Sequence, residues 1–263
     1  MNIPTKVIVL SLTLMSSIVS HPVVADRGKE IFDAANKKDD GFGNTDEIQE
    51  LLIINAQGKE TRRVMRLIRL EGSGEVGEKT LRVFRKPKDS KGTALLTHGM
   101  IDKDDSQWMY LPNLKRIKRI ASAAKTSRFS GSEFTFEDLA IQDLNDYSYH
   151  FVRETEYGGV AVFEVELTPL DTKSGYSKLV TWLNQDNLNV LKINYYNKKN
   201  KFSKTLTFEN YQLYNDKYWR AHITRMVNHL TDTESTVSVL GDVAFQTGLS
   251  EKDFSKSRLK NIR

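Results

Sequence analysis

The sequence predicts a mainly β protein, in which one curved antiparallel sheet forms an incomplete, half-open barrel with a few covering helices. The first observation is that apolar and polar residues alternate in many short segments, as they do in strands with one buried face. The second is that turn residues separate these segments at short intervals. Short connections make successive strands antiparallel, because parallel neighbours need long crossovers. The third is that helical segments are scarce, so a large sheet must curl to bury its apolar face.

The elements can be placed in order along the chain. A helix is expected over residues 26–38, where Asp26 is a suitable N-cap and Ile31 and Phe32 begin an apolar side, and the sequence GFGN then ends it. Strand-like alternation is clearest at residues 81–84, 163–167, 191–196, 205–208 and 219–224. Further helical segments are expected around 133–146 and 250–260. Such a sheet would enclose an apolar interior, although a tightly filled barrel or a sandwich would show the same alternation.

The first 25 residues have the features of a cleaved signal peptide. Lys6 supplies the positive charge, residues 7–19 form the apolar core, and Val23-Val24-Ala25 is a small-residue cleavage site. Residues 26–263 contain no Pro/Gly/Ser-rich linker and are expected to form a single domain. The chain has no cysteine, so its stability must come from a packed core rather than from disulfides. We therefore expect a soluble protein that is exported to the periplasm.

Several functional classes are disfavoured by the residues present. A net charge of +5 would allow nucleic acid, anionic lipid or an acidic protein as a partner, but export argues against nucleic acid. The G-x-G-x-x-G pattern at 72–77 precedes a strand-like run instead of the helix of a dinucleotide site. Residues 36–47 partly match a calcium loop, but Lys38 stands where an oxygen ligand is needed. The histidines are scattered, without zinc-site spacing, and no G-x-S-x-G elbow occurs. We predict no catalytic residue, no metal site and no cofactor.

A basic stretch is the most informative feature of the middle of the chain. From Ser106 to Ser132 there are six Lys or Arg and no acid. A solvated face is the usual explanation, but here the cations alternate with apolar residues, which favours a hairpin and leaves a helix open. An apolar row fringed by cations suits a ligand with an apolar body and an anionic head, or an acidic protein surface. The candidates for apolar ligand contact are Trp108, Tyr110, Leu111 and Ile117, and those for headgroup or partner contact are Arg116 and Arg119.

The segment GSEFTFEDL, residues 131–139, follows the basic stretch. Thr135 and Asp138 have the spacing of a capping box at a helix start, so the acids have a structural role before any catalytic one. Phe134 and Phe136 are expected to point toward the barrel interior and complete the set of candidate ligand-binding residues.

The strings SQWMYLPNLKRIKRI and SRFSGSEFTFEDL, with the early GFGN and the late GLSEKDF, resemble a signature of periplasmic proteins of the LolA-like superfamily. The matching subgroup is described as outer-membrane lipoprotein-sorting-like proteins, and the resemblance spans most of the chain after residue 25. It implies a half-barrel lidded by helices, an apolar cavity that carries acyl chains, and an exporter of the resistance–nodulation–division type as a partner. The namesake carrier is shorter and lacks this signature, so none of its functional residues is transferred.

Together these features predict a non-enzymatic periplasmic carrier. It would bind the acyl chains of a lipid or a lipoprotein, touch membranes transiently, and move its cargo to or from the outer membrane. One alternative is an accessory subunit of a resistance–nodulation–division exporter whose cavity is vestigial. Another is an enzyme that acts on envelope lipids or glycans.

Overall fold

The computed structural model describes residues 26–73, 76–101, 103–141 and 143–261, so the predicted signal peptide lies outside the described residues. Within them the chain forms one α-helix and fourteen strands. The α-helix is α1 (Arg27–Asp39). The strands are β1 (Asn44–Ile54), β2 (Glu60–Leu70), β3 (Val76–Lys86), β4 (Ala94–Met100), β5 (Ser106–Leu111), β6 (Arg116–Arg119), β7 (Tyr147–Tyr157), β8 (Val160–Pro169), β9 (Tyr176–Asn184), β10 (Val190–Asn197), β11 (Phe202–Tyr214), β12 (Tyr218–Asn228), β13 (Thr233–Val239) and β14 (Ala244–Phe245). Short 3₁₀ helices are η1 (Pro112–Leu114), η2 (Ser122–Ala124), η3 (Leu144–Asp146), η4 (Glu251–Phe254) and η5 (Arg258–Asn261).

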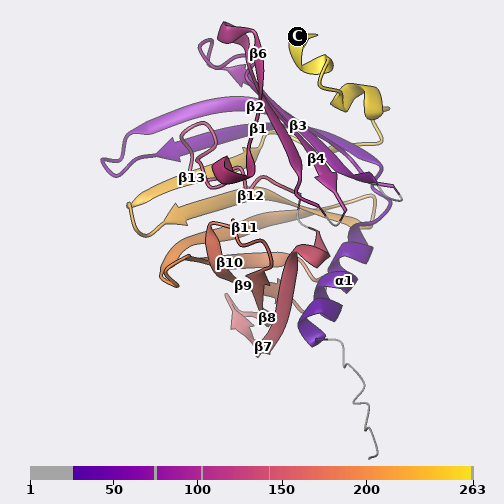
Figure 1. Ribbon diagram of the computed structural model, residues 1–263. Coiled ribbons are helices and arrows are strands. Elements are labelled where there is room, and N and C mark those ends of the chain that lie inside the picture. The colour runs from indigo at the N-terminus through magenta and orange to yellow at the C-terminus, as the bar shows by residue number, and fades with distance from the viewer. Residues whose placement is uncertain (1–25, 74–75, 102, 142, 262–263) are drawn as a thin grey trace, which may run out of the picture.

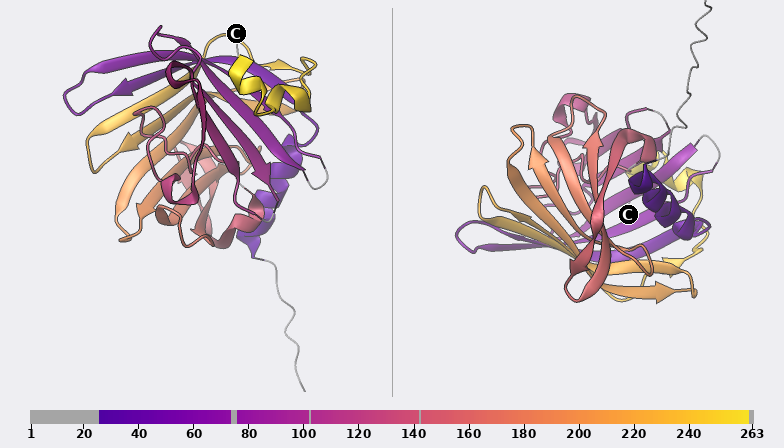
Figure 2. Two further views of the ribbon diagram at one scale, coloured as in Figure 1. Left: turned by 45° about the horizontal axis from the view of Figure 1, so that its top comes forward. Right: turned by 90° about the horizontal axis from the view of Figure 1, so that it is seen from below.

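The strands make one antiparallel sheet in the order β6-β5-β4-β3-β2-β1-β13-β12-β11-β10-β9-β8-β7, with β14 added beside β1. Nearly all neighbours in the sheet are neighbours in the chain. The exceptions are β14 beside β1 and the pairing of β1 with β13, where Leu51 lies opposite Val237 and joins the early and late halves. Strands β6 and β7 are the two edges, so the sheet curls strongly without closing (Figures 1 and 2). The prediction of a mainly β, half-open antiparallel barrel is confirmed.

Helix α1 packs on the β7–β8 end of the concave face, as Figure 1 shows. Asp26 caps it by accepting a hydrogen bond from the backbone N–H of Gly28 at 2.7 Å. A Cβ at Gly28 would lie 2.8 Å from Cγ1 of Val165, so only glycine allows the helix to approach this closely. Phe32 then packs against Tyr149, with ring centroids 5.2 Å apart. The helix predicted over 26–38 is therefore present.

The other two predicted helical segments are shorter than expected. Around 133–146 the capping box is present, because the N–H of Thr135 donates to Asp138 and the N–H of Asp138 donates to the hydroxyl of Thr135. The chain makes only a turn there, followed by η3. The segment around 250–260 forms η4 and η5. Both segments are held by contacts with the sheet, which replace the regular hydrogen bonds that a longer helix would make.

Apolar residues gather in two clusters, one on each face of the sheet. The main cluster fills the concave face and includes Leu51, Leu95 and Phe134. The second lies on the convex face of β2–β5 and includes Ile68, Leu81 and Leu96. Each of these residues is next in the chain to one that faces the barrel interior, and adjacent residues of a strand point to opposite faces. The C-terminal segment covers this second cluster with Phe254 and Leu259, which are 1% and 0% exposed.

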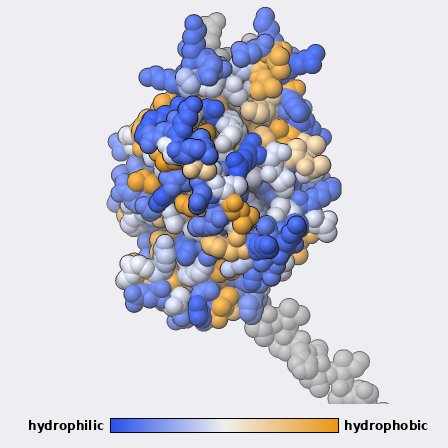
Figure 3. Space-filling view, turned by 90° about the vertical axis from the view of Figure 1, so that its left-hand side faces the viewer, coloured by the Kyte–Doolittle hydropathy of each residue, from blue (hydrophilic) through white to orange (hydrophobic). Residues whose placement is uncertain are grey.

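The face shown in Figure 3 is mostly hydrophilic, with apolar residues in scattered spots. No helix in the described part of the chain is long and apolar enough to cross a membrane.

Candidate functional site: the concave cavity

The concave side of the half-barrel holds a cavity of about 540 Å³. It lies between α1, the strands β1–β3 and β10–β13, and the loop that carries residues 129–140. Pockets for small ligands typically measure about 300–1,000 Å³, so this volume is sufficient for one. Exposed Lys38 and Lys217 belong to its lining, so the cavity opens to solvent at that end.

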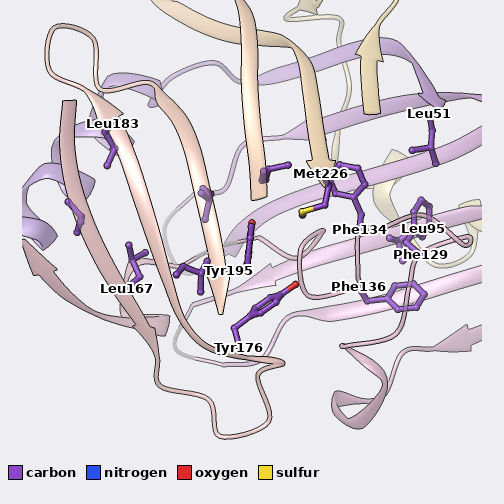
Figure 4. Close-up of a cluster of buried hydrophobic side chains, with 14 of the residues drawn as sticks. Leu51, Leu95, Phe129, Phe134, Phe136, Leu167, Tyr176, Leu183, Tyr195 and Met226 are labelled. Atoms are coloured by element: carbon purple, nitrogen blue, oxygen red, sulfur yellow. The ribbon is translucent and has the colours of Figure 1, made fainter. Parts of the chain in front are cut away.

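Most of the cavity wall is apolar, and both halves of the sheet contribute to it. The alternation of the strands explains why: Leu206 and Phe208 are two residues apart on β11 and share a face, whereas Thr207 between them faces outward. Close to these residues, Phe134 reaches into the cluster from the loop, and Figure 4 shows it among the buried side chains of the concave face. The main apolar lining residues are Leu51, Met65, Phe134, Leu206, Phe208 and Val237.

The loop over the cavity, residues 120–141, will be called the concave loop. Its aromatic rings are buried in the sheet's main cluster: Phe129 stacks on Phe84 with centroids 5.6 Å apart, and Phe129 meets Phe136 edge-on at 6.1 Å. Figure 4 shows Phe129, Phe134 and Phe136 together in this cluster. The sequence-based expectation that Phe134 and Phe136 point into the barrel is confirmed, since they are 5% and 7% exposed within the concave core.

Buried polar contacts also anchor the concave loop. The Glu133 carboxylate, 2% exposed, accepts hydrogen bonds from Asn228 and Thr233 at 2.7 Å each. It also pairs with Arg128 at 3.0 Å. The N–H of Glu133 donates to the hydroxyl of Ser235 at 2.9 Å. These contacts tie the loop to β12 and β13 and satisfy a carboxylate that would otherwise be costly to bury.

Asp138 makes a second anchor farther along the concave loop. Its carboxylate accepts hydrogen bonds from the hydroxyl of Tyr176 at 2.7 Å and from the ammonium of Lys204 at 3.4 Å. Lys204 also donates to the carbonyl of Glu133 at 2.8 Å. Burial and the nearby Asp138 charge raise the pKa of Tyr176 well above its usual value, so its hydroxyl stays protonated and donates. All three polar groups are occupied by one another, which supports the structural role predicted for the acids of GSEFTFEDL.

Three arginines stand in the cavity wall, and two of them are paired with acids. Arg69 makes two hydrogen bonds to Glu78, at 2.8 and 3.0 Å. Burial lowers the pKa of Arg69, but the charge and hydrogen bonds of Glu78 outweigh this, so the pKa is raised overall. Arg220 donates through Nη1 to Asp39 at 2.5 Å. Its Nε and Nη2 are buried and have no hydrogen-bond partner among the described residues.

Arg82 differs from the other two, because its only side-chain hydrogen bond in the described structure goes to the hydroxyl of Thr80, at 3.0 Å. Burial and the neighbouring charge of Arg69 lower the pKa of Arg82 to about 10. The guanidinium therefore remains charged at neutral pH although it lies in the cavity wall. Across the same end of the cavity, the ring of Phe42 lies 5.0 Å from Cζ of Arg69 and 5.5 Å from Cζ of Arg220.

The turn that carries Phe42 is the GFGN sequence. Gly41 and Gly43 have φ of +91° and +69°, which favour glycine, and their N–H groups donate to Glu71 at 2.6 and 2.7 Å. This turn holds the Phe42 ring, 4% exposed, against the two arginines.

A second cavity, of about 420 Å³, lies on the other side of the concave loop, towards β5 and β6. Acidic and basic groups dominate it: Lys125 pairs with Asp171, and Asp105 accepts hydrogen bonds from the N–H groups of Ile141 and Met100 at 2.6 and 3.1 Å. Burial raises the pKa of Asp105 to about 6. No cluster of His, Cys, Asp and Glu suited to a metal ion occurs among the residues that the structure describes.

The structure separates the ligand-contact residues that the sequence suggested. Phe134 lines the main cavity, and Phe136 lines the second one. Trp108, Tyr110 and Ile117 instead pack against the convex cluster beneath the C-terminal segment. The reason is strand parity: on β5, Gln107 and Met109 take the concave face, which sends Trp108 and Tyr110 to the other side.

Leu111 and Arg116 lie opposite each other next to the tip of the β5–β6 hairpin, and Arg119 lies at the far end of β6, opposite Trp108. Leu111 is half-buried and belongs to neither the main cavity nor the convex cluster, while Arg116 and Arg119 are exposed on the edge strand β6. Arg119 borders the second cavity. The hairpin expected for the basic stretch is present, because β6 pairs antiparallel with β5.

Several cavity residues were missed by sequence reasoning. In the sequence, three arginines appear to be on the solvent-facing side of alternating strands, because each is flanked by apolar residues: Arg69, Arg82 and Arg220. In β2 and β3 both faces are buried, and the arginines share the concave face with Met65 and Phe84. The available signal was the GFGN turn, which the structure places beside two of these arginines.

Comparisons with known proteins agree with this architecture. A family model whose description reads "Uncharacterized protein" matches residues 77–261. Among curated proteins, no sequence matches the chain. A solved structure described as an outer membrane lipoprotein-sorting protein domain, from Vibrio parahaemolyticus, is 42% identical, with a TM-score of 0.87 over 90% of this chain and 100% of that one.

Two further solved structures are similar. A DUF1329 family protein from Desulfovibrio piger is 26% identical, with a TM-score of 0.81 over 89% of this chain and 99% of that one. A LolA superfamily protein from Nitrosomonas europaea is 18% identical, with a TM-score of 0.70 over 88% of this chain and 98% of that one, and this likeness concerns the fold alone. The curled sheet and the relative that is 42% identical over nearly the whole chain lead to one conclusion: the chain has the fold of a LolA superfamily protein and belongs to the family of the outer membrane lipoprotein-sorting protein domain.

Proposed function

We propose that this protein is an exported, non-catalytic carrier that holds the acyl chain of a lipid or lipoprotein in its concave cavity and transfers it between the membranes of the cell envelope. The observation that supports the proposal most is the cavity of about 540 Å³, with a mostly apolar wall, inside a half-open barrel. The lipoprotein-sorting description of the relative from Vibrio parahaemolyticus supports the same class of cargo. The signal peptide predicted for residues 1–25 supports export, with residues 26–263 as the mature single domain.

Burial of the acyl chain would drive binding. Each methylene removed from water contributes about 0.8 kcal/mol, so ten of them contribute about 8 kcal/mol before the cost of ordering the ligand. Leu206, Phe208 and Val237 offer the apolar surface for this from adjacent strands. The anchoring acids Glu133 and Asp138 are engaged in structural contacts, and this supports a carrier rather than an enzyme.

The first test is native mass spectrometry of the protein purified from cells, followed by displacement of a fluorescent fatty acid. We expect a co-purifying lipid and displacement by unlabelled fatty acid. The variant Val237→Trp, which fills the cavity from β13, should weaken probe binding tenfold or more. Its matched control is Thr236→Trp, the adjacent residue on the other face of β13, which should bind as the wild type does. If the protein carries no lipid and the probe never binds, the carrier proposal fails.

The proposal includes a membrane partner, an exporter of the resistance–nodulation–division type. The β5–β6 hairpin is the surface we assign to this contact, because Leu114 is 63% exposed at its tip and Arg116 and Arg119 follow on β6. A photo-crosslinking residue at position 114 should capture an inner-membrane protein in cells, whereas one at exposed Glu156 should not. Equal capture at both positions would contradict the assignment.

A further inference from the structure

One end of the concave cavity is cationic, and apolar side chains form most of the rest of its wall. Arg69, Arg82 and Arg220 stand in the wall of the same cavity that Leu51 and Phe208 line. We infer that the cavity is built for an amphiphile with an anionic head, a carboxylate or a phosphate, which binds at Arg82 beside Arg69 and Arg220 while its tail fills the apolar part. This inference rests on the proposed function and specifies its cargo.

The charges at this end of the cavity leave Arg82 free to bind a ligand. Glu78 occupies Arg69 with two hydrogen bonds, and Asp39 occupies one nitrogen of Arg220. No described carboxylate forms an ion pair with Arg82, and its single side-chain bond is to a neutral hydroxyl.

The other charged groups that face this region leave an excess of positive charge at this end of the cavity. Glu47 is the remaining acid, and it already accepts a hydrogen bond from Gln49 at 2.7 Å. Burial raises the pKa of Glu47 against the opposing effect of the three arginines. Lys38 and Lys217 add positive charge at the rim. Among the described residues, cations therefore outnumber acids at this end of the cavity.

The position of Arg82 is contiguous with the apolar wall. In the sheet Arg82 lies directly opposite Leu67, and Phe84 follows it on the same concave face. A head bound at Arg82 would therefore continue into a tail that lies along the concave sheet, without a polar gap between them. The planar guanidinium group is suited to carboxylate and phosphate, to which it donates two parallel hydrogen bonds.

The arginine of the exposed hairpin provides a contrast. Arg116 was the headgroup candidate that the sequence suggested, but it is exposed on β6 and is not part of the cavity lining. An unpaired surface arginine is solvated, so an anion that binds it gains little electrostatic energy. In a cavity wall the dielectric constant is lower, and the same pair attracts more strongly. Binding of the head should therefore depend on Arg82 and not on Arg116.

The test compares ligands that share a dodecyl chain at pH 7.5: dodecanoate, dodecyl phosphate and uncharged dodecanol, each displacing a fluorescent probe from the full mature protein. If only burial of the apolar chain mattered, dodecanol would bind most tightly, because an uncharged alcohol loses less hydration than an anion when it leaves water. We expect the two anions to bind the wild type at least tenfold more tightly than dodecanol. Arg82→Gln should lose this preference while its affinity for dodecanol stays within about twofold. Arg116→Gln should behave as the wild type, and circular dichroism should show both variants folded.

Each outcome has a distinct meaning. Tight binding of dodecanol and dodecanoate alike, abolished by Val237→Trp, would overturn the anionic-head inference and leave the carrier proposal standing. An anion preference that survives in Arg82→Gln and disappears in Arg116→Gln would also overturn it. Failure of every dodecyl ligand to bind would overturn both. If Arg82→Gln does not fold, the test rests on the wild type alone. A wild type that binds dodecanol as tightly as the two anions would then contradict the inference. A preference for dodecyl phosphate over dodecanoate would identify a phospholipid-type head, and the reverse a fatty acid.

Discussion

The two faces of the sheet each carry an apolar cluster and a covering segment, but the two covers differ in how fully they fill the space beneath them. On the convex face the C-terminal segment completes the packing, and Phe254 and Leu259 are almost fully buried. On the concave face α1 and the concave loop cover the sheet, yet a cavity of about 540 Å³ remains between them. The comparison shows that this chain can fill an apolar surface with its own residues when the surface is structural, which makes the unfilled space on the other face significant.

The two covers also differ in how they are attached. The C-terminal segment is held by apolar side chains, by His98 Nε2 at 2.7 Å from the carbonyl of Phe254, and by an ion pair between Lys79 and the largely exposed Glu251. The concave loop is held by its phenylalanines and, in addition, by the buried acids Glu133 and Asp138. Polar contacts require defined geometry, so they fix the position of a cover that has to stand over a cavity instead of collapsing into it.

The largest expected effect is on the convex face. Phe254→Ala should lower the free energy of unfolding by about 3–5 kcal/mol, the usual cost of removing a fully buried phenylalanine. Chemical denaturation measures this, with exposed Lys252→Ala as the control that should change little. Because the convex cluster is separate from the cavity, the folded fraction of Phe254→Ala should bind the fluorescent probe as the wild type does. Loss of binding without loss of stability would contradict the division between the two faces.

A smaller effect is expected where the concave loop is anchored. Glu133→Gln removes the charge that Arg128 contacts and leaves at least one buried donor of Asn228 or Thr233 without an acceptor. The free energy of unfolding should fall by about 1–3 kcal/mol. Probe affinity should fall as well, because the loop carries Phe134 into the cavity wall. Glu156→Gln, an exposed change on β7, is the matched control. Unchanged binding in a destabilised Glu133→Gln would show that the loop does not shape the site.

The smallest expected effect concerns Asp105 in the second, polar cavity. Burial raises its pKa to about 6 from 3.8, so the folded state holds this proton more tightly than the unfolded state. Its contribution to stability is therefore full below about pH 4 and is lost as the pH rises through about 6. Between pH 4 and pH 7 the wild type should lose about 1–2 kcal/mol relative to Asp105→Asn, since the carboxylate is only partly buried. The difference in the free energy of unfolding between the two proteins at each pH removes the contribution of other titrating groups. A difference that does not change with pH would contradict the raised pKa of Asp105.

The sequence predicted the strands and their antiparallel order well, because both depend on local alternation and short turns. It could not predict the β1–β13 pairing that joins the two halves, since Leu51 and Val237 are far apart in the chain. It also placed Trp108 and Tyr110 in the cavity, because alternation shows that a strand has two faces without showing which one is concave. On β2–β5 both faces are buried, and only the path of the C-terminal segment decides between them.

The candidate site was predicted in part. Phe134 and Phe136 were placed correctly in the interior, because the capping box of Thr135 and Asp138 fixes their local geometry. The helix expected after it is reduced to a turn and the short η3, and Asp138 is bound instead to Tyr176 and Lys204 on the sheet. Arg82 and Arg220 escaped notice because a charged residue within an alternating strand is normally solvated, and only the fold shows that these face a cavity.

The most direct test of the central claim is a crystal structure of the protein with a fatty acid that carries bromine at its terminal carbon. Anomalous scattering from the bromine locates the tail without assumptions about the density of the chain. Our account predicts a bromine peak in the concave cavity, among Leu206, Phe208 and Val237, with the carboxylate at Arg82. A peak on the convex face, beneath the C-terminal segment or at the β5–β6 hairpin, with the concave cavity unoccupied, would contradict it.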